Sequence, residues 1–163
     1  WTYNEPTIHL PFNKETSLLA QKNNLKVIYV SNGYFSQQSI NEILGFVDAF
    51  NIDLKSMSKD FYKKVCGADL DVVLDNLRRI HIEGKHLEIT NLILNGYNDS
   101  VEEISQLCDF VVDELSADVP LHFSRAFPYY KMNDISPTNP EILYKAKEIA
   151  LNKGIKNVYL GNI

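Results

Sequence analysis

Polar side chains able to bind a charged ligand recur directly after the short apolar runs of this sequence. They comprise carboxylates, amides, a lysine, a histidine and an arginine. A purely structural core avoids such a set, because burying charge is unfavourable. Together these segments therefore indicate a ligand site. They are Asn4-Glu5-Pro6, Ser31-Asn32-Gly33, Asn51-Ile52-Asp53-Leu54-Lys55, Asn95-Gly96-Tyr97-Asn98-Asp99, His122-Phe123-Ser124-Arg125 and Gly161-Asn162.

Taken singly, each of these segments also has a structural explanation. Asn-Gly is typical of turns, because both residues tolerate a positive φ. A single histidine such as His122 is often a hydrogen-bonded core residue, and Asp53 and Lys55 are spaced to form an ion pair on one strand face. The ligand-site prediction therefore depends on the segments meeting at one end of a sheet.

Apolar runs rich in β-branched residues alternate with segments of helical period, which is typical of repeated strand-helix units. We therefore predict an α/β fold with a parallel sheet and right-handed crossovers. Capping boxes are expected at Ser39 with Glu42 and at Ser100 with Glu103, and Asn139-Pro140 opens the last helix. The predicted strands are Leu25–Ser31, Ala49–Leu54, His86–Leu94, Leu121–Ala126, Asn157–Leu160 and a short one at Trp1–Tyr3.

Several predicted strands alternate apolar and polar residues. Asn51, Asp53 and Lys55 share one strand face, whereas a doubly wound sheet buries both faces and would be apolar throughout. A parallel sheet with one polar face fits a barrel or partial barrel with a ligand at its carboxyl strand ends. A flavodoxin-like fold is the alternative, but the sequence contains no glycine-rich phosphate loop of the kind that it needs.

Composition bounds the function further. The 163 residues are 45% hydrophobic and 23% charged, which predicts one globular domain over residues 1–163. A formal net charge of -5 argues against a nucleic-acid surface. The apolar runs are far too short to cross a membrane, and no leader segment opens the chain, so we expect a cytoplasmic protein.

Two cysteines, Cys66 and Cys108, are too few and too far apart for a disulfide framework or a four-ligand zinc site. Cys108 falls in an apolar stripe of helical period, which predicts a buried core residue. We predict no metal ligand in this chain and assign no catalytic residue.

Seven motifs in fixed order make the sequence similar to a known family, the radical S-adenosylmethionine (SAM) enzymes of the AmmeMemoRadiSam type. These are relatives of pyruvate formate-lyase activating enzyme. The resemblance runs from Tyr3 to Asn162, nearly the whole chain. The motifs are Tyr3–Thr7, Val30–Tyr34, Asn51–Lys55, Phe61–Ala68, Asn98–Ser100, His122–Met132 and Val158–Asn162.

This resemblance implies a (βα)6 partial barrel in which a 4Fe-4S cluster binds the amino and carboxylate groups of SAM. One electron cleaves SAM to methionine and a 5'-deoxyadenosyl radical, which abstracts hydrogen from a substrate. It also implies an electron donor such as flavodoxin or ferredoxin, and a substrate that is either a protein or a small molecule.

The resemblance also assigns roles to residues of this chain. Asn4 and Glu5 resemble the family's Gly-Gly-Glu motif, which receives the SAM ammonium group. Asp53 would accept hydrogen bonds from the ribose, Lys55 would neutralise the SAM carboxylate or a nearby acid, and Asn32 would serve the ribose or methionine moiety.

His122 and Arg125 lie where the family contacts adenosine and substrate. The sequence departs from the family at the cluster, because it has no Cys-x3-Cys-x2-Cys loop. We therefore expect the carboxyl-terminal two-thirds of a radical SAM partial barrel, truncated at its amino-terminal strands and inactive alone.

Two rival functions stay open. Lys55 on a strand beside apolar neighbours is a candidate Schiff-base nucleophile of a barrel lyase. Alternatively, the chain is a degenerate, non-catalytic binding domain, which is consistent with the absent cluster motif.

Overall fold

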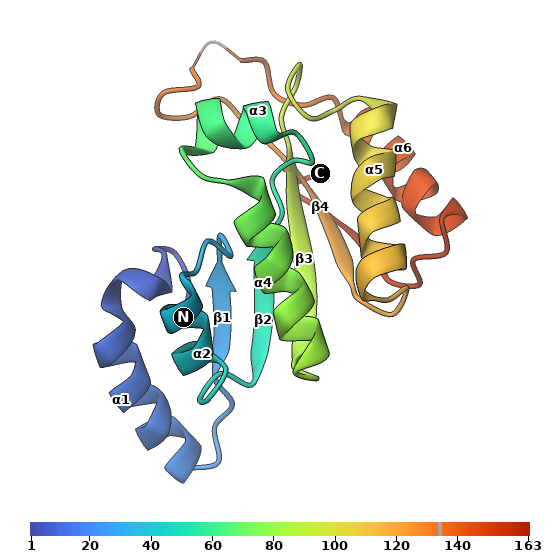
Figure 1. Ribbon diagram of the computed structural model, residues 1–163. Coiled ribbons are helices and arrows are strands. Elements are labelled where there is room, and N and C mark those ends of the chain that lie inside the picture. Colours follow the sequence, from blue (N-terminus) through green and yellow to red (C-terminus); the bar gives the residue numbers. More distant parts are fainter. Residues whose placement is uncertain (134) are drawn as a thin grey trace. The chain divides into compact units, whose positions relative to one another are not determined.

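The computed structural model describes residues 1–133 and 135–163 (Figure 1). The chain divides into two compact units, each described here by itself. The first unit comprises Trp1–Asp53 and Asp71–Glu88, and the second comprises Leu54–Leu70 and Ile89–Ile163. In the part of the chain that the structure describes, no helix is long and apolar enough to cross a membrane.

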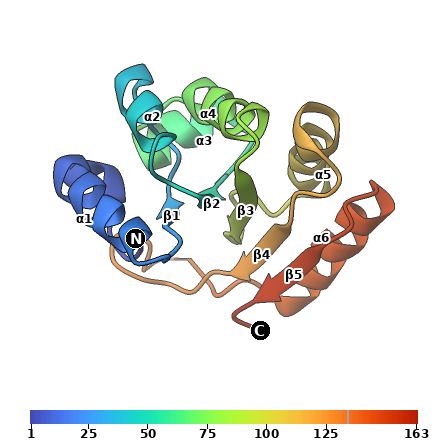
Figure 2. The same ribbon diagram turned by 90° about the horizontal axis from the view of Figure 1, so that it is seen from below.

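Strands and helices alternate along the chain, which confirms the predicted α/β class. The strands follow one another in the sheet in chain order, β1-β2-β3-β4-β5 (Figure 2). The strands are β1 (Ile28–Ser31), β2 (Ala49–Asp53), β3 (His86–Ile93), β4 (Leu121–Arg125) and β5 (Val158–Gly161). The helical elements are η1 (Pro6–His9), α1 (Leu10–Lys22), α2 (Gln37–Ile43), α3 (Lys59–Phe61), η2 (Tyr62–Cys66), α4 (Leu70–Ile82), α5 (Val101–Phe110), η3 (Val111–Leu115) and α6 (Pro140–Asn152).

In the first unit, β1 and β2 pair in parallel, with Ser31 opposite Ile52. Tyr29 and Phe50 are buried on these two strands, and their ring centroids lie 6.3 Å apart in an edge-to-face arrangement. Phe46, just after α2, packs edge-to-face on Tyr29 as well. This aromatic cluster anchors the strand pair whose carboxyl ends carry predicted site residues.

In the second unit, β4 pairs in parallel with β3 and with β5. α6 contacts both β4 and β5, and α5 packs beside α6, as Figure 2 shows. Their apolar residues cover one face of the strands, including the buried Cys108 and Ala146. The burial predicted for Cys108 is confirmed.

The strands have one buried and one polar face, as predicted. In β2, Phe50 and Ile52 are buried, while Asn51 and Asp53 are only partly buried. β3 and β4 alternate in the same way. The polar face is therefore the more exposed face of these strands.

Two helix signals were read wrongly or missed. α2 is capped by Ser36, whose side chain accepts a hydrogen bond from the Ser39 amide, so the box predicted at Ser39 was displaced by three residues. α1 was not predicted, because its buried residues are the polar Asn13 and Ser17 while Phe12 is exposed. Its pattern is the reverse of an ordinary amphipathic helix.

The short strand predicted at Trp1–Tyr3 is absent. Trp1 alone pairs with β1: its amino group donates to the Ile28 carbonyl at 2.6 Å, and its carbonyl accepts from the Val30 amide at 2.9 Å. Tyr3 then adopts a φ of 72°, which ends any extended run.

We expect the aromatic cluster of Tyr29, Phe46 and Phe50 to contribute strongly to the free energy of unfolding. Phe50→Ala should lower the free energy of unfolding by about 3–5 kcal/mol, because it opens a cavity beside Tyr29. Ile82→Ala is the control, since Ile82 is 78% exposed, and it should change that energy by less than about 0.5 kcal/mol. Urea unfolding followed by circular dichroism measures both, and equal losses would contradict this assignment of the core.

Candidate functional site

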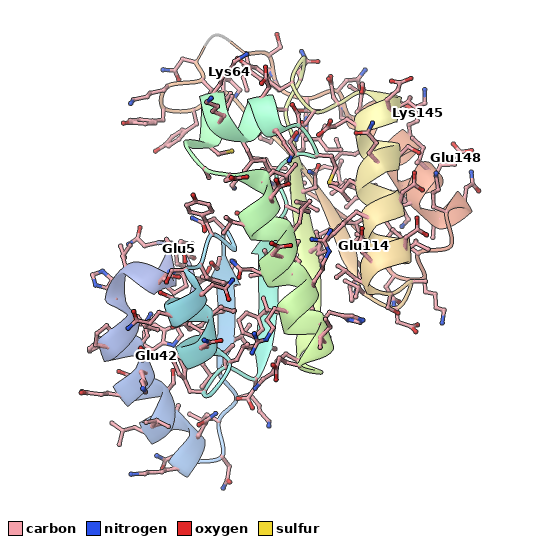
Figure 3. The ribbon with its side chains drawn as sticks, in the orientation of Figure 1. Glu5, Glu42, Lys64, Glu114, Lys145 and Glu148 are labelled. Atoms are coloured by element: carbon pink, nitrogen blue, oxygen red, sulfur yellow. The ribbon has the colours of Figure 1, made fainter. Side chains whose placement is uncertain are left out.

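The Glu5 carboxylate ties η1 to the carboxyl end of β1; Figure 3 labels this side chain. It accepts hydrogen bonds from the Thr7 amide at 3.2 Å and the Thr7 hydroxyl at 2.6 Å. It also accepts from the Ser31 hydroxyl at 2.9 Å and the Asn32 amide at 2.9 Å. The first unit thus brings together Glu5 and Asn32, two predicted site residues, through direct contact.

The turn after β1 has a tightly specified backbone. The Asn32 side-chain oxygen accepts from the Tyr34 amide at 2.8 Å. Gly33 has a φ of 72°, and a Cβ added there would lie 2.7 Å from Cγ2 of Ile52. Only glycine meets both requirements, so Asn-Gly here is a turn packed against the neighbouring strand.

Asn76 supports the same turn and was not predicted. It is 2% exposed on α4, and its amide donates to the carbonyls of Gly33 at 2.9 Å and Phe35 at 3.0 Å. The available signal was a polar residue among the apolar positions Val73 and Leu77 of an amphipathic helix. Such a residue usually has a buried hydrogen-bonding partner.

Asp53 lies at the end of β2. Because Ser31 is opposite Ile52, Asp53 follows at the level of the turn after β1, on the partly exposed face. Asn4 is exposed and lines a pocket of about 160 Å³ with Glu5 and His9. Asn4, Glu5, Asn32 and Asp53 therefore all belong to the carboxyl-end region of the first unit.

In the second unit, the backbone of Lys55 is held on both sides. Its backbone amide donates to the Tyr62 hydroxyl at 3.1 Å, and its carbonyl accepts from the side-chain amide of Asn98 at 2.6 Å. The preceding carbonyl, of Leu54, accepts from the buried Asn91 side chain at 2.7 Å. The backbone of Lys55 is therefore held in place by hydrogen bonds on both sides.

The charge of the Lys55 ammonium acts on the thiol of Cys66. Burial raises the pKa of Cys66, and the positive charge of Lys55 offsets part of that increase. Cys108 differs, because burial raises its pKa to about 12. Both cysteines are free thiols.

Glu103 has a different role from the one predicted. The Ser100 hydroxyl accepts from the Glu103 amide at 3.1 Å, so this half of the predicted capping box is confirmed. The Glu103 carboxylate, however, accepts from the Ser56 hydroxyl and from the Met57 amide. It thereby binds the first turn of α5 to the loop that follows Lys55.

His122 and Arg125 lie on β4 with aromatic neighbours. The His122 ring stacks on Tyr159 of β5, with centroids 5.0 Å apart and planes at 24°. Arg125 lies over the Phe127 ring at 4.7 Å and donates from Nε to the Thr138 carbonyl at 2.7 Å. His122 thus offers a flat, partly exposed surface, while Arg125 also braces the loop after β4.

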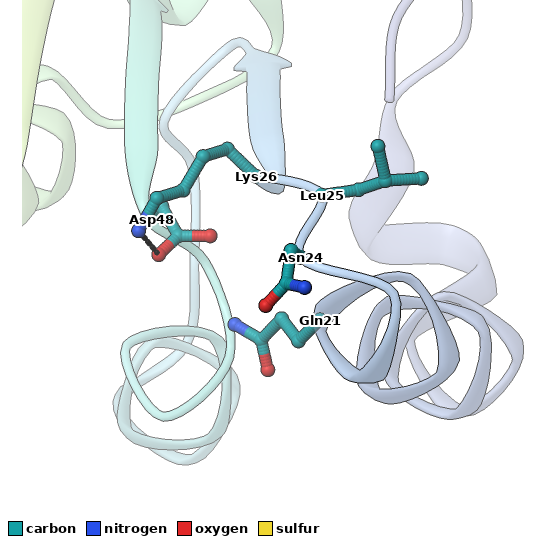
Figure 4. Close-up of a pocket in the computed structure, with 5 residues that line it drawn as sticks. All are labelled: Gln21, Asn24, Leu25, Lys26 and Asp48. Atoms are coloured by element: carbon teal, nitrogen blue, oxygen red, sulfur yellow. Dashed lines mark hydrogen bonds and ion pairs between the residues drawn. The ribbon is translucent and has the colours of Figure 1, made fainter.

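A separate pocket of about 400 Å³ lies before β1 and β2, at their amino ends. Figure 4 shows its lining, with the Lys26–Asp48 ion pair of 3.2 Å as a dashed line. Asp48 also accepts from the Val27 amide, and this bond, followed by the contribution of Lys26, lowers the pKa of Asp48. None of the predicted site residues lines this pocket.

Comparison with known proteins decides the family. The model of the Radical SAM superfamily matches residues 1–111 of the chain. The chain belongs to the radical SAM superfamily. The resemblance seen in the motifs is thereby confirmed at the level of the superfamily.

Two curated relatives match nearly the whole chain. This radical SAM chain is 41% identical over 163 residues to an uncharacterized protein of Methanocaldococcus jannaschii, covering 100% of the chain and 48% of that protein. It is 24% identical over 169 residues to the 4-hydroxyphenylacetate decarboxylase activating enzyme of Clostridioides difficile strain CD196, covering 97% and 53%. The chain thus spans about half the length of these relatives.

A solved structure supports the fold. A domain of pyruvate-formate lyase-activating enzyme from Bacteroides vulgatus matches with a TM-score of 0.80 at 17% identity, covering 99% of this chain and 97% of that one. At this identity the match establishes the fold alone. It confirms the open α/β sheet expected for a radical SAM partial barrel.

The residues of the chain do not fit an iron-sulfur cluster. Among residues 1–133 and 135–163, no group of three or more histidines, cysteines or acids could hold a metal ion. Cys108 is fully buried, with its pKa raised to about 12, and cannot combine with Cys66 as a ligand pair in the Cys-x2-Cys spacing. By contrast, the acids, amides and lysine at the strand ends suit the ammonium, hydroxyl and carboxylate groups of SAM.

The effect of Lys55 on the pKa of Cys66 gives a testable property of the radical SAM chain. Lys55→Met should slow alkylation of Cys66 by iodoacetamide at pH 8 by about twofold to fivefold, because losing the nearby cation raises the thiol pKa and lowers the thiolate fraction. Cys108 should stay unlabelled. Lys64→Met is the control, since Lys64 pairs with Asp60 at 2.6 Å on the surface. An unchanged rate of Cys66 alkylation in Lys55→Met would show that the Lys55 ammonium does not act on this thiol.

Proposed function

We propose that this chain is the SAM-binding core of a radical SAM enzyme of the activating-enzyme type. The observation that carries the proposal is the Asp53-Leu54-Lys55 segment, which ends β2 with an acid on the polar face and a lysine on a fixed backbone. The family match extends over this segment. The role proposed for these residues is to bind SAM.

In the first unit, Asp53 accepts hydrogen bonds from the ribose hydroxyls, and Asn32 contacts the ribose or methionine moiety. Glu5 acts chiefly by holding the turn, because its carboxylate already accepts from four donor groups of the chain. The backbone carbonyls of Asn4 and Glu5 are then the acceptors proposed for the SAM ammonium group.

In the second unit, Lys55 pairs with the SAM carboxylate. His122 offers its ring, supported by Tyr159, to a planar group of adenosine or substrate. Arg125 contributes to the same region while its Nε braces the loop through Thr138. Lys55 is thus the charged partner proposed for the SAM carboxylate.

The cluster chemistry belongs to the whole protein. When bound, a 4Fe-4S cluster would supply the electron that cleaves SAM to the 5'-deoxyadenosyl radical; no group among the described residues could hold its iron. Flavodoxin or ferredoxin is the proposed electron donor. The name of the Clostridioides difficile relative, an activating enzyme of a decarboxylase, supports a protein substrate.

Calorimetric titration with SAM tests the proposal. Wild-type chain should bind SAM, while Asp53→Ala and Lys55→Met should each weaken binding about tenfold or more, because each removes a charge-assisted hydrogen bond. Lys64→Met is the matched control and should leave the affinity unchanged. Failure of the wild type to bind, or equal affinity in all variants, would overturn the proposed site.

A second measurement tests the reaction. The intact protein, reconstituted with iron and sulfide and reduced, should release 5'-deoxyadenosine from SAM, and residues 1–163 alone should release none. Absence of release from an intact protein with a well-formed cluster would favour a non-catalytic binding domain.

A further inference from the structure

The side chain of Asn98 links the loop after β3 to the residue that follows β2. Asn98 is 1% exposed, and its oxygen accepts from the Leu94 amide at 2.7 Å. Its nitrogen donates to the carbonyls of Lys55 at 2.6 Å and Leu92 at 3.0 Å. Both ends of the amide are therefore engaged with backbone groups.

The surrounding contacts leave the Lys55 backbone little freedom. Tyr62 accepts its amide hydrogen at 3.1 Å, so the residue is fastened at both its amide and its carbonyl. Beyond it, Glu103 holds Ser56 and Met57. Movement of the lysine is thus confined to its side chain.

Asn98 is chemically suited to this position in a way that close analogues are not. Aspartate could still accept from Leu94, but its second oxygen would face the carbonyl oxygens of Lys55 and Leu92. Leucine would leave all three backbone groups without this partner. The site therefore needs a side chain that donates on one side and accepts on the other.

We propose that Asn98 is a positioning residue, which fixes the backbone of Lys55 so that the lysine ammonium meets the carboxylate of an amino-acid-bearing nucleoside. This inference rests on the proposed function and names the part of SAM that the second unit recognises. A charge-assisted pair depends on geometry, so a displaced backbone weakens recognition of the carboxylate while leaving recognition of the nucleoside intact.

The test compares SAM with 5'-methylthioadenosine, which lacks the amino-acid carboxylate. Asn98→Asp should weaken SAM binding about tenfold and change the affinity for 5'-methylthioadenosine less than about twofold. Lys55→Met should show the same selectivity, and the double variant should lose little more than Lys55→Met alone. Asn152→Asp adds the same charge at the exposed end of α6, outside the candidate site, and should alter neither affinity.

Tyr62→Phe provides a milder second variant if Asn98→Asp unfolds, which circular dichroism would detect. It removes the hydroxyl that accepts from Lys55 while keeping the ring, and it should reduce SAM affinity selectively, about threefold. Equal weakening of SAM and 5'-methylthioadenosine in the folded variants would overturn the positioning role.

Alkylation of Cys66 separates this inference from the proposed function, because it reports on the Lys55 ammonium without any SAM. Asn98→Asp and Tyr62→Phe should shift the Cys66 rate toward the Lys55→Met value, whether or not SAM binds. An unchanged rate in both variants would overturn the inference even if SAM binding is confirmed. Altered rates with no SAM binding by the wild type would overturn the proposed function instead.

Discussion

Buried side-chain hydrogen bonds to backbone carbonyls are the constraint on which the carboxyl ends of these strands depend. A loop that leaves a parallel strand has peptide groups with no neighbouring strand to pair them, and burying such groups unpaired is unfavourable. Asn76 pairs the carbonyls after β1, and Asn91 and Asn98 pair those after β2. The loops that carry the candidate site are thereby kept in one conformation.

The same interactions explain how a polar face coexists with a stable core. Apolar residues of each strand pack on one side, while the opposite side keeps acids, amides and His122 partly exposed. Asn91 is an exception, because it lies on the buried side of β3 among Ile89 and Ile93. The Asn91 side chain donates to the Leu54 carbonyl, so its role is structural. The candidate ligand site is therefore on the partly exposed side.

Periodicity predicted β1 to β5 to within a few residues, because alternation of buried and exposed positions is a local property, but it also predicted a strand at Trp1–Tyr3 that is absent. It failed for α1, where Asn13 and Ser17 are buried and Phe12 is exposed. It also misplaced the cap of α2, because Ser36 and Ser39 are both able to cap and only the backbone decides between them.

The sequence predicted which polar residues follow the strands, but it did not predict the hydrogen bonds that their side chains make. Glu5 was expected to bind a ligand, yet its carboxylate binds Thr7, Ser31 and Asn32. Glu103 was expected to cap its own helix, yet its carboxylate accepts hydrogen bonds from Ser56 and Met57, which lie 47 and 46 positions earlier in the sequence. Such long-range partners are set by the tertiary fold, which the local pattern does not encode.

The central claim is that the carboxyl strand ends, rather than the larger pocket at the amino ends, bind SAM. A nuclear magnetic resonance titration of isotope-labelled chain with SAM tests it most directly, since every backbone amide reports separately. We predict shifts at the amides of Ser31–Tyr34, Asp53–Met57 and His122–Ala126, with Gln21–Lys26 unchanged. Shifts confined to Gln21–Lys26 and Asp48, with none at the carboxyl strand ends, would contradict the account.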